Sequence, residues 1–164
     1  MKKTIAILFA SLFALAAFAQ NDAATLWGEL KKQGTLSMDF SLKGLDKDGV
    51  VVTDEVGKAY LQGDCYRIEC GDMLICCDSQ SMWLYNSATG ELVIDRDEAL
   101  PFMKATNVKK DQMGNVNATY IADDITFKVK VSNMAPPAAS YGNEFFIIDE
   151  KTLPDDVIVT DLRD

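Results

Sequence analysis

The 164-residue chain contains no histidine. This absence excludes Ser-His-Asp and Cys-His catalysis, metal sites with histidine ligands and any pH switch built on imidazole. Basic residues are also scarce, because 16 lysines and arginines stand against 25 aspartates and glutamates, for a formal charge of −9. Such a surface repels nucleic-acid phosphates. We therefore expect a protein that binds no nucleic acid and is not an enzyme, since a secreted hydrolase would need a base that the chain lacks.

Recognisable metal and cofactor motifs are missing as well. The stretch 46–49 is typical of a turn rather than a calcium loop, because a third acidic ligand and the terminal glutamate are absent at the required spacing. The cysteines do not show the C-x-x-C spacing of zinc sites or redox centres. The sequence therefore predicts no metal and no cofactor.

The longest apolar run lies at the N-terminus. Residues 1–19 begin with two lysines after Met1, continue as an apolar run from Ile5 and end in Ala-Phe-Ala. This is the pattern of a secretory signal peptide with an A-x-A cleavage site, and the run is shorter than the roughly 20 residues of a membrane-spanning helix. We predict cleavage after Ala19 and a single exported domain over residues 20–164.

After this segment the sequence predicts one helix and then strands. Apolar residues recur at helical spacing up to Leu30, and Gly34 marks the end of this amphipathic helix. From Leu36 to Lys43 apolar and polar residues alternate instead, which predicts a half-buried strand. The same alternation returns in segments 56–63, 66–70, 73–77, 116–120 and 125–131. Turn signals at 46–49, 71–72 and 123–124 indicate an antiparallel meander.

The alternation gives the predicted sheet one apolar face that must be covered. Charged residues such as Arg67 and Lys128 fall on the opposite face, which can meet water. The available covers are the first helix and the segment 97–107. A curved sheet with two short helices leaves room for a cavity, and a completely filled interior is the equal alternative.

The cysteines allow two strand registers. If the dipeptide 71–72 forms a two-residue turn, Tyr66 lies opposite Cys77 and Cys65 meets Cys76 only diagonally. A shift of one residue would place Cys65 directly opposite Cys77, where a disulfide can form. Unbridged thiols are expected in the first register and one disulfide in the second.

An apolar face without catalytic groups suits an acyl chain or an apolar peptide. By strand parity, the residues predicted to line it are Leu36, Met38, Phe40, Leu42, Ala59, Leu61, Tyr66, Ile68, Ile75, Phe127 and Val129. The residues predicted to cover it as a lid are Trp27, Leu30, Phe102 and Met103. Each of these residues is equally a candidate for ordinary core.

Several stretches resemble the LolA family of outer-membrane lipoprotein carriers. They are the glycine-opened strand 57–61, the hairpin around 66–77, the run 78–86 with its Trp-Leu-Tyr-Asn end, and segments 91–94, 100–103 and 145–163. The chain departs from the family where 62–64 reads Gln-Gly-Asp in place of an arginine followed by proline. In known members that arginine helps to hold the lid shut, and Arg67 is a candidate to replace it.

The resemblance implies a mainly β, α+β fold: an incomplete, strongly curved antiparallel β-barrel capped by short α-helices. It implies a monomeric periplasmic carrier or chaperone that binds the acyl chains of lipoproteins in an apolar cavity. Such a carrier receives acylated lipoproteins from an inner-membrane lipoprotein-releasing ABC transporter and delivers them to an outer-membrane acceptor. Two alternatives stay open: a periplasmic binding protein for another lipid or hydrophobic ligand, and a lipoprotein-sensing regulatory module.

Overall fold

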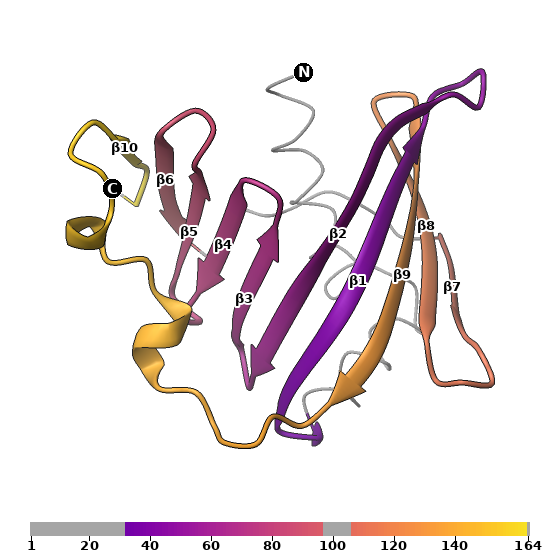
Figure 1. Cartoon of the computed structure of the whole chain (residues 1–164), viewed down its shortest axis with the longest axis horizontal. Coiled ribbons are helices and arrows are strands. Elements are labelled where there is room, and N and C mark those ends of the chain that lie inside the picture. The colour runs from indigo at the N-terminus through magenta and orange to yellow at the C-terminus, as the bar shows by residue number, and fades with distance from the viewer. Residues whose placement is uncertain (1–31, 97–105, 164) are drawn as a thin grey trace.

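A computed structural model describes residues 32–96 and 106–163, which form one large open sheet (Figure 1). The strand order is β10-β6-β5-β4-β3-β2-β1-β9-β8-β7. All neighbours are antiparallel except β10 and β6, which run parallel, so the sheet is mixed. The strands are β1 (Thr35–Leu45), β2 (Val51–Gln62), β3 (Cys65–Cys70), β4 (Met73–Cys77), β5 (Ser81–Asn86), β6 (Glu91–Arg96), β7 (Thr106–Lys110), β8 (Val116–Ala122), β9 (Ile125–Ala135) and β10 (Ile158–Asp161).

Helices are few in this part of the chain. Apart from Lys32, the described residues hold only two one-turn 3-10 helices, η2 (Asn143–Phe146) and η3 (Glu150–Thr152). Capping of the sheet by short α-helices is therefore not confirmed. Of the two predicted covering helices, residues 22–31 and 97–105 lie outside the described residues. The second covering segment was predicted to extend over residues 97–107. Its end was predicted wrongly, because residues 106 and 107 belong to strand β7 (Thr106–Lys110).

No helix within the described ranges is both long and apolar enough to span a membrane.

The β3–β4 hairpin has the first of the two registers that the sequence allows. Tyr66 pairs with Cys77 and Cys70 pairs with Met73, so only Gly71 and Asp72 separate the strands. Gly71 has a positive φ of 52°, which suits the tight turn. In this register Cys65 does not lie opposite Cys77, and all four cysteines carry thiols rather than disulfides.

Two glycines on the central strands leave space for the rings of two phenylalanines on the strands beside them. Phe40 of β1 is paired with Gly57 of β2, and Gly44 of β1 is paired with Phe127 of β9. A Cβ at Gly57 would overlap the Phe40 ring and the Glu69 carbonyl oxygen, and a Cβ at Gly44 would lie 3.0 Å from the Phe127 ring. Both rings are almost completely buried. The strands can therefore bring these rings onto the sheet only because the opposite positions lack side chains.

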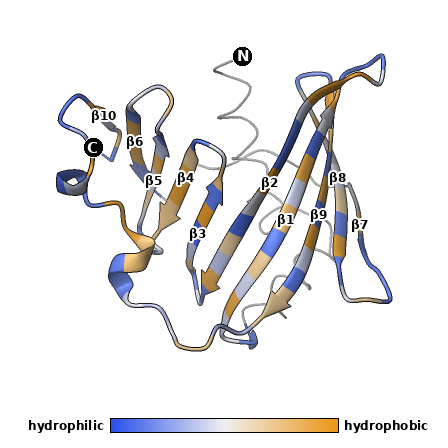
Figure 2. Cartoon of the chain, viewed as in Figure 1, coloured by the Kyte–Doolittle hydropathy of each residue, from blue (hydrophilic) through white to orange (hydrophobic). Residues whose placement is uncertain are grey.

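The sheet carries apolar side chains on both faces where β4 and β5 lie. Figure 2 shows the alternation of apolar and polar residues along β1, β2 and β9 that gives those strands a single apolar face. In β4, alternate residues join different clusters, since Ile75 belongs to a large cluster and Cys76 to a small one. Because alternate side chains of a strand point to opposite faces, the two clusters lie on opposite sides of the sheet.

We predict that Gly57→Ala destabilises the fold by about 2 to 4 kcal/mol, because the new methyl group must displace the Phe40 ring and the β3 backbone. The measurement is urea unfolding followed by circular dichroism. Lys58→Ala, on the exposed face of the same strand, is the matched control and should change the free energy of unfolding by less than about 0.5 kcal/mol. Equal stability of the Gly57→Ala variant and the wild type would contradict the tight fit.

Candidate functional site

The structure gathers all of the predicted lining residues into one buried cluster. They lie on β1, β2, β3, β4 and β9, share one face of the sheet, and are at most 8% exposed. This cluster, called the large cluster below, also contains Cys70, Met73, Cys77 and Met82. The first three continue the alternation of β3 and β4, which is the signal that identifies them. Met82 follows the turn between β4 and β5, so the sequence does not show on which face of the sheet its side chain lies.

The large cluster provides an apolar surface without an ionised group. Its polar side chains are those of Tyr66 and of the thiols of Cys70 and Cys77. Burial raises the pKa of the Cys70 thiol to about 11, with a further contribution from the nearby Glu55 carboxylate. At neutral pH this thiol is therefore protonated and uncharged. Such a surface can bind apolar groups by burial but offers no general acid, base or activated nucleophile.

The residues predicted to cover this face are Trp27, Leu30, Phe102 and Met103, and all of them lie outside the described residues.

The sequence predicts that the protein has no metal site. Across residues 32–96 and 106–163, no three Cys, Asp or Glu side chains come together in a way that could bind a metal ion.

On the opposite face, the small cluster is covered by the C-terminal segment 141–157, called the strap. The small cluster consists of the buried residues Cys76, Trp83, Leu92, Ile94 and Ile148. Ile148, Leu153 and Val157 of the strap pack in or against it. Trp83 and Tyr85 both lie on this face. The sequence predicts that they share a face but leaves open which one, because the preceding loop hides the parity of the strand. The strap closes the second apolar face of β4–β6 with side chains of the same chain.

Arg67 fastens the beginning of the strap to β3. Its Nη1 donates a hydrogen bond of 3.2 Å to the Phe145 carbonyl oxygen, and its guanidinium carbon lies 4.8 Å from the centre of the Phe145 ring. Its Nε forms an ion pair of 2.7 Å with Glu69. The Phe145 ring also stacks on Tyr141 and meets Tyr60 edge to face. Arg67 therefore lies on the face opposite the large cluster, and the proposal that it replaces a lid arginine on that cluster is wrong.

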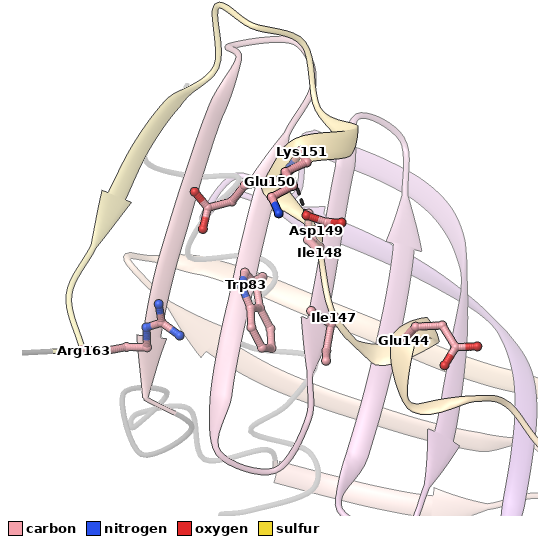
Figure 3. Close-up of a pocket in the computed structure, with 8 residues that line it drawn as sticks. All are labelled: Trp83, Glu144, Ile147, Ile148, Asp149, Glu150, Lys151 and Arg163. Carbon is pink, nitrogen blue, oxygen red and sulfur yellow. Dashed lines mark hydrogen bonds between the residues drawn. The ribbon is translucent and has the colours of Figure 1, made fainter.

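A groove lies between the strap and the C-terminal end of the described chain (Figure 3). Its volume is about 560 Å³. Its lining residues are Trp83, Glu144, Ile147, Ile148, Asp149, Glu150, Lys151 and Arg163. Figure 3 shows the Trp83 ring between the strap residues on one side and Arg163 on the other. The sequence did not indicate this groove, because it brings together β5 and segments about 60 to 80 residues further along the chain.

The Arg163 wall of the groove is fixed by a local network. Arg163 pairs with Asp161 through Nη2 and Oδ2 at 2.5 Å, and this hydrogen bonding lowers the pKa of Asp161 to about 2. Arg96 of β6 donates two hydrogen bonds, of 3.0 and 2.6 Å, to the Arg163 carbonyl oxygen. The guanidinium of Arg163 is paired with Asp161. We therefore assign this wall of the groove a structural role.

Comparison with known proteins gives a fold neighbour and no family. No protein-family model and no curated sequence matches the chain. The crystal structure of an uncharacterized conserved protein from Thermus thermophilus is similar, with a TM-score of 0.51 and 12% sequence identity. The match covers 86% of this chain and 99% of that one. At this identity the likeness concerns the fold alone.

We predict that Arg67→Met loosens the strap and lowers the free energy of unfolding by about 1 to 2 kcal/mol, because it removes the hydrogen bond to the Phe145 carbonyl and the contact with the Phe145 ring. Hydrogen exchange measured by mass spectrometry should become faster in residues 143–148. Lys58→Ala is the control on the same face. Unchanged exchange in the strap of a folded Arg67→Met variant would show that Arg67 does not fasten it.

We predict that Cys65 reacts with iodoacetamide at least about tenfold faster than Cys70 or Cys76 in the folded protein. Cys65 is half-buried, whereas burial raises the pKa of both other thiols to about 11. Since their ordinary value is 9.0, the stability that these protonated thiols contribute is present below about pH 9 and is lost as the pH rises through about 11. The measurement is mass spectrometry of the alkylated peptides over time. Equal rates before unfolding would contradict the described burial.

Proposed function

We propose that this protein is a periplasmic carrier or chaperone of the LolA kind, which holds the acyl chains of lipoproteins against the large cluster. The observation that supports the proposal is the gathering of all predicted lining residues on one apolar face. The large cluster itself contains no Asp, Glu, Lys or Arg side chain, so the site is suited to shielding hydrocarbon. The proposed action includes no covalent step.

The finer architecture belongs to the same proposal. The open sheet would curve into an incomplete barrel, and helices containing Trp27, Leu30, Phe102 and Met103 would cover its apolar side. An incoming acyl chain would displace part of this cover. Each buried methylene contributes about 0.8 kcal/mol, so about a dozen of them are enough to keep a lipid anchor in solution. A limited movement of the cover would then weaken the binding at delivery.

The partners follow from this function. An inner-membrane lipoprotein-releasing ABC transporter would load the exported, monomeric carrier, and an acceptor at the outer membrane would receive the lipoprotein. The acidic surface fits a carrier that moves between membranes, because a formal charge of −9 limits its own adsorption to anionic headgroups. The fold neighbour from Thermus is uncharacterized and adds no functional argument.

We predict saturable one-to-one binding of a fluorescent acyl probe to the protein purified from the periplasm, with displacement by a triacylated lipopeptide. Native mass spectrometry of the same preparation should show co-purified lipoprotein. Displacement by free fatty acid or phospholipid but not by lipopeptide would favour a carrier for another lipid. Absence of any uptake would mean that the apolar face is an ordinary filled core.

Met38→Gln tests the location of the proposed site, because it places a polar amide of similar length on the buried apolar face. We expect its affinity for the acyl probe to fall by about tenfold or more, given a cost of about 1 to 3 kcal/mol for an unpaired buried amide. The matched control is Leu153→Gln in the strap, on the other face, which should leave uptake unchanged. Both variants are compared only after circular dichroism shows that they are folded. Normal uptake by a folded Met38→Gln protein would overturn the assignment.

A further inference from the structure

Strand β2 extends beyond the strand that pairs with it on one side. It pairs with β1 from Val51 opposite Leu45 to Gln62 opposite Thr35, with an irregularity at Val52, which has no register partner. Its pairing with β3 begins only at Gly57, which lies opposite Cys70. Figure 1 shows the β1–β2 hairpin reaching past the turn between β3 and β4. The segment 51–56, called the β2 edge, therefore has a strand neighbour on one side only.

The β2 edge is accessible and has the composition of a strand that pairs readily. Its valines are exposed, with Val56 at 73% and both Val51 and Val52 at 49%. The hydrogen bonds of the described residues include none that fills its side away from β1. Backbone groups of a strand point alternately to either side, so this side presents unpaired donors and acceptors. Valine and threonine favour the extended conformation that strand pairing needs.

The side chains of the β2 edge define what can lie beside it. Asp54 and Val56 lie on one face in the regular part of the edge, and Asp54 forms an exposed ion pair of 3.0 Å with Lys43 of β1. Glu55 lies on the other face, where its carboxylate oxygen is 3.6 Å from the position of a Cβ at Gly71. A strand added here would meet an aspartate and a valine along one face.

The charge around the β2 edge is predominantly negative. Acidic residues lie in the edge itself, in the adjoining β1–β2 turn and in the β3–β4 turn beside it: Asp46, Asp48, Asp54, Glu55 and Asp72. The nearby cations are Lys43, which is engaged with Asp54, Lys47 in the turn, and Lys58, which lies between Asp39 and Glu69 in the register. A second copy of this acidic chain would bring like charges together, whereas a cationic segment would be attracted.

We propose that the β2 edge is a docking site for an extended cationic segment of a partner protein, which adds to the sheet as a further strand. The complementary segment carries a lysine or arginine and, two positions away, an apolar residue. Backbone hydrogen bonds supply the binding, and the contacts with Asp54 and Val56 supply the selectivity. The site is separate from the large cluster, so the proposal stands whether or not the protein carries acyl chains.

The test is a nuclear magnetic resonance titration of the ¹⁵N-labelled protein with the capped peptide Thr-Val-Thr-Lys-Thr-Val-Thr. We expect shift changes and slowed amide exchange at residues 51–56. A peptide with glutamate in place of the lysine should bind at least about fivefold more weakly, and a peptide N-methylated at alternate residues should not bind.

Substitutions of Asp54 in the protein test the charge selectivity of the β2 edge more directly. Asp54→Lys should weaken binding of the lysine peptide by about tenfold and strengthen binding of the glutamate peptide relative to the wild type. Asp54→Asn should weaken the lysine peptide by about two- to fivefold. The matched control is Asp156→Asn, which changes the net charge equally at an exposed position in the turn before β10 and should leave the affinity unchanged.

Several results would overturn the proposal. Shift changes confined to the outer edges, β10 or β7, would place strand addition elsewhere. Equal affinity for the lysine and glutamate peptides, or no binding by the folded protein, would remove the proposed selectivity. A homodimer in sedimentation experiments with protected amides at 51–56 would make a second copy the occupant. Each result is independent of acyl-probe uptake, which is measured on the same preparations.

Discussion

The packing of Phe40 against Gly57 and of Phe127 against Gly44 determines how the centre of this sheet is built. Both pairs involve β1, the strand that lies between β2 and β9. Each ring occupies the space that a side chain on the opposite strand would otherwise take. Because a slip of one residue would turn every side chain of β1 to the other face, these pairs and the apolar alternation support the same register. The position of the large cluster follows from that register.

The described residues cover the two faces of the sheet to different extents. The small cluster is closed by the strap, which Arg67 and the Tyr141 and Phe145 rings fasten at its beginning and Ile148 anchors further along. The strap's contacts thus cover one apolar face with side chains of the same chain. The large cluster extends over more strands and gathers the residues that parity predicts for a ligand-binding face. This difference favours the proposal that the face of the large cluster has a cover that moves.

The shifted pKa values of the described groups have two causes, burial and pairing. The buried thiols are kept protonated, and the exposed Asp161 carboxylate is kept ionised by its pairing with Arg163. The acidic side chains are instead spread over the surface, where they influence which partners can approach. At the β2 edge this surface charge coincides with unpaired backbone groups, which gives a strand-adding partner both a means of binding and a reason for selectivity.

Local sequence was enough to predict six of the ten strands, three of the turns between them, and the burial of the residues expected to line the large cluster. These features depend on a period of two and on tight turns, so the burial of Phe40 can be predicted from neighbouring residues. The sequence allows two registers for the β3–β4 hairpin, and the structure shows the one with Tyr66 opposite Cys77. Only the folded chain reveals that β10 pairs in parallel with β6, that the strap covers Trp83, and that Arg67 fastens the strap. These arrangements join segments far apart in the chain, and a local pattern of hydropathy does not say which distant segment supplies the apolar surface that a given face must bury.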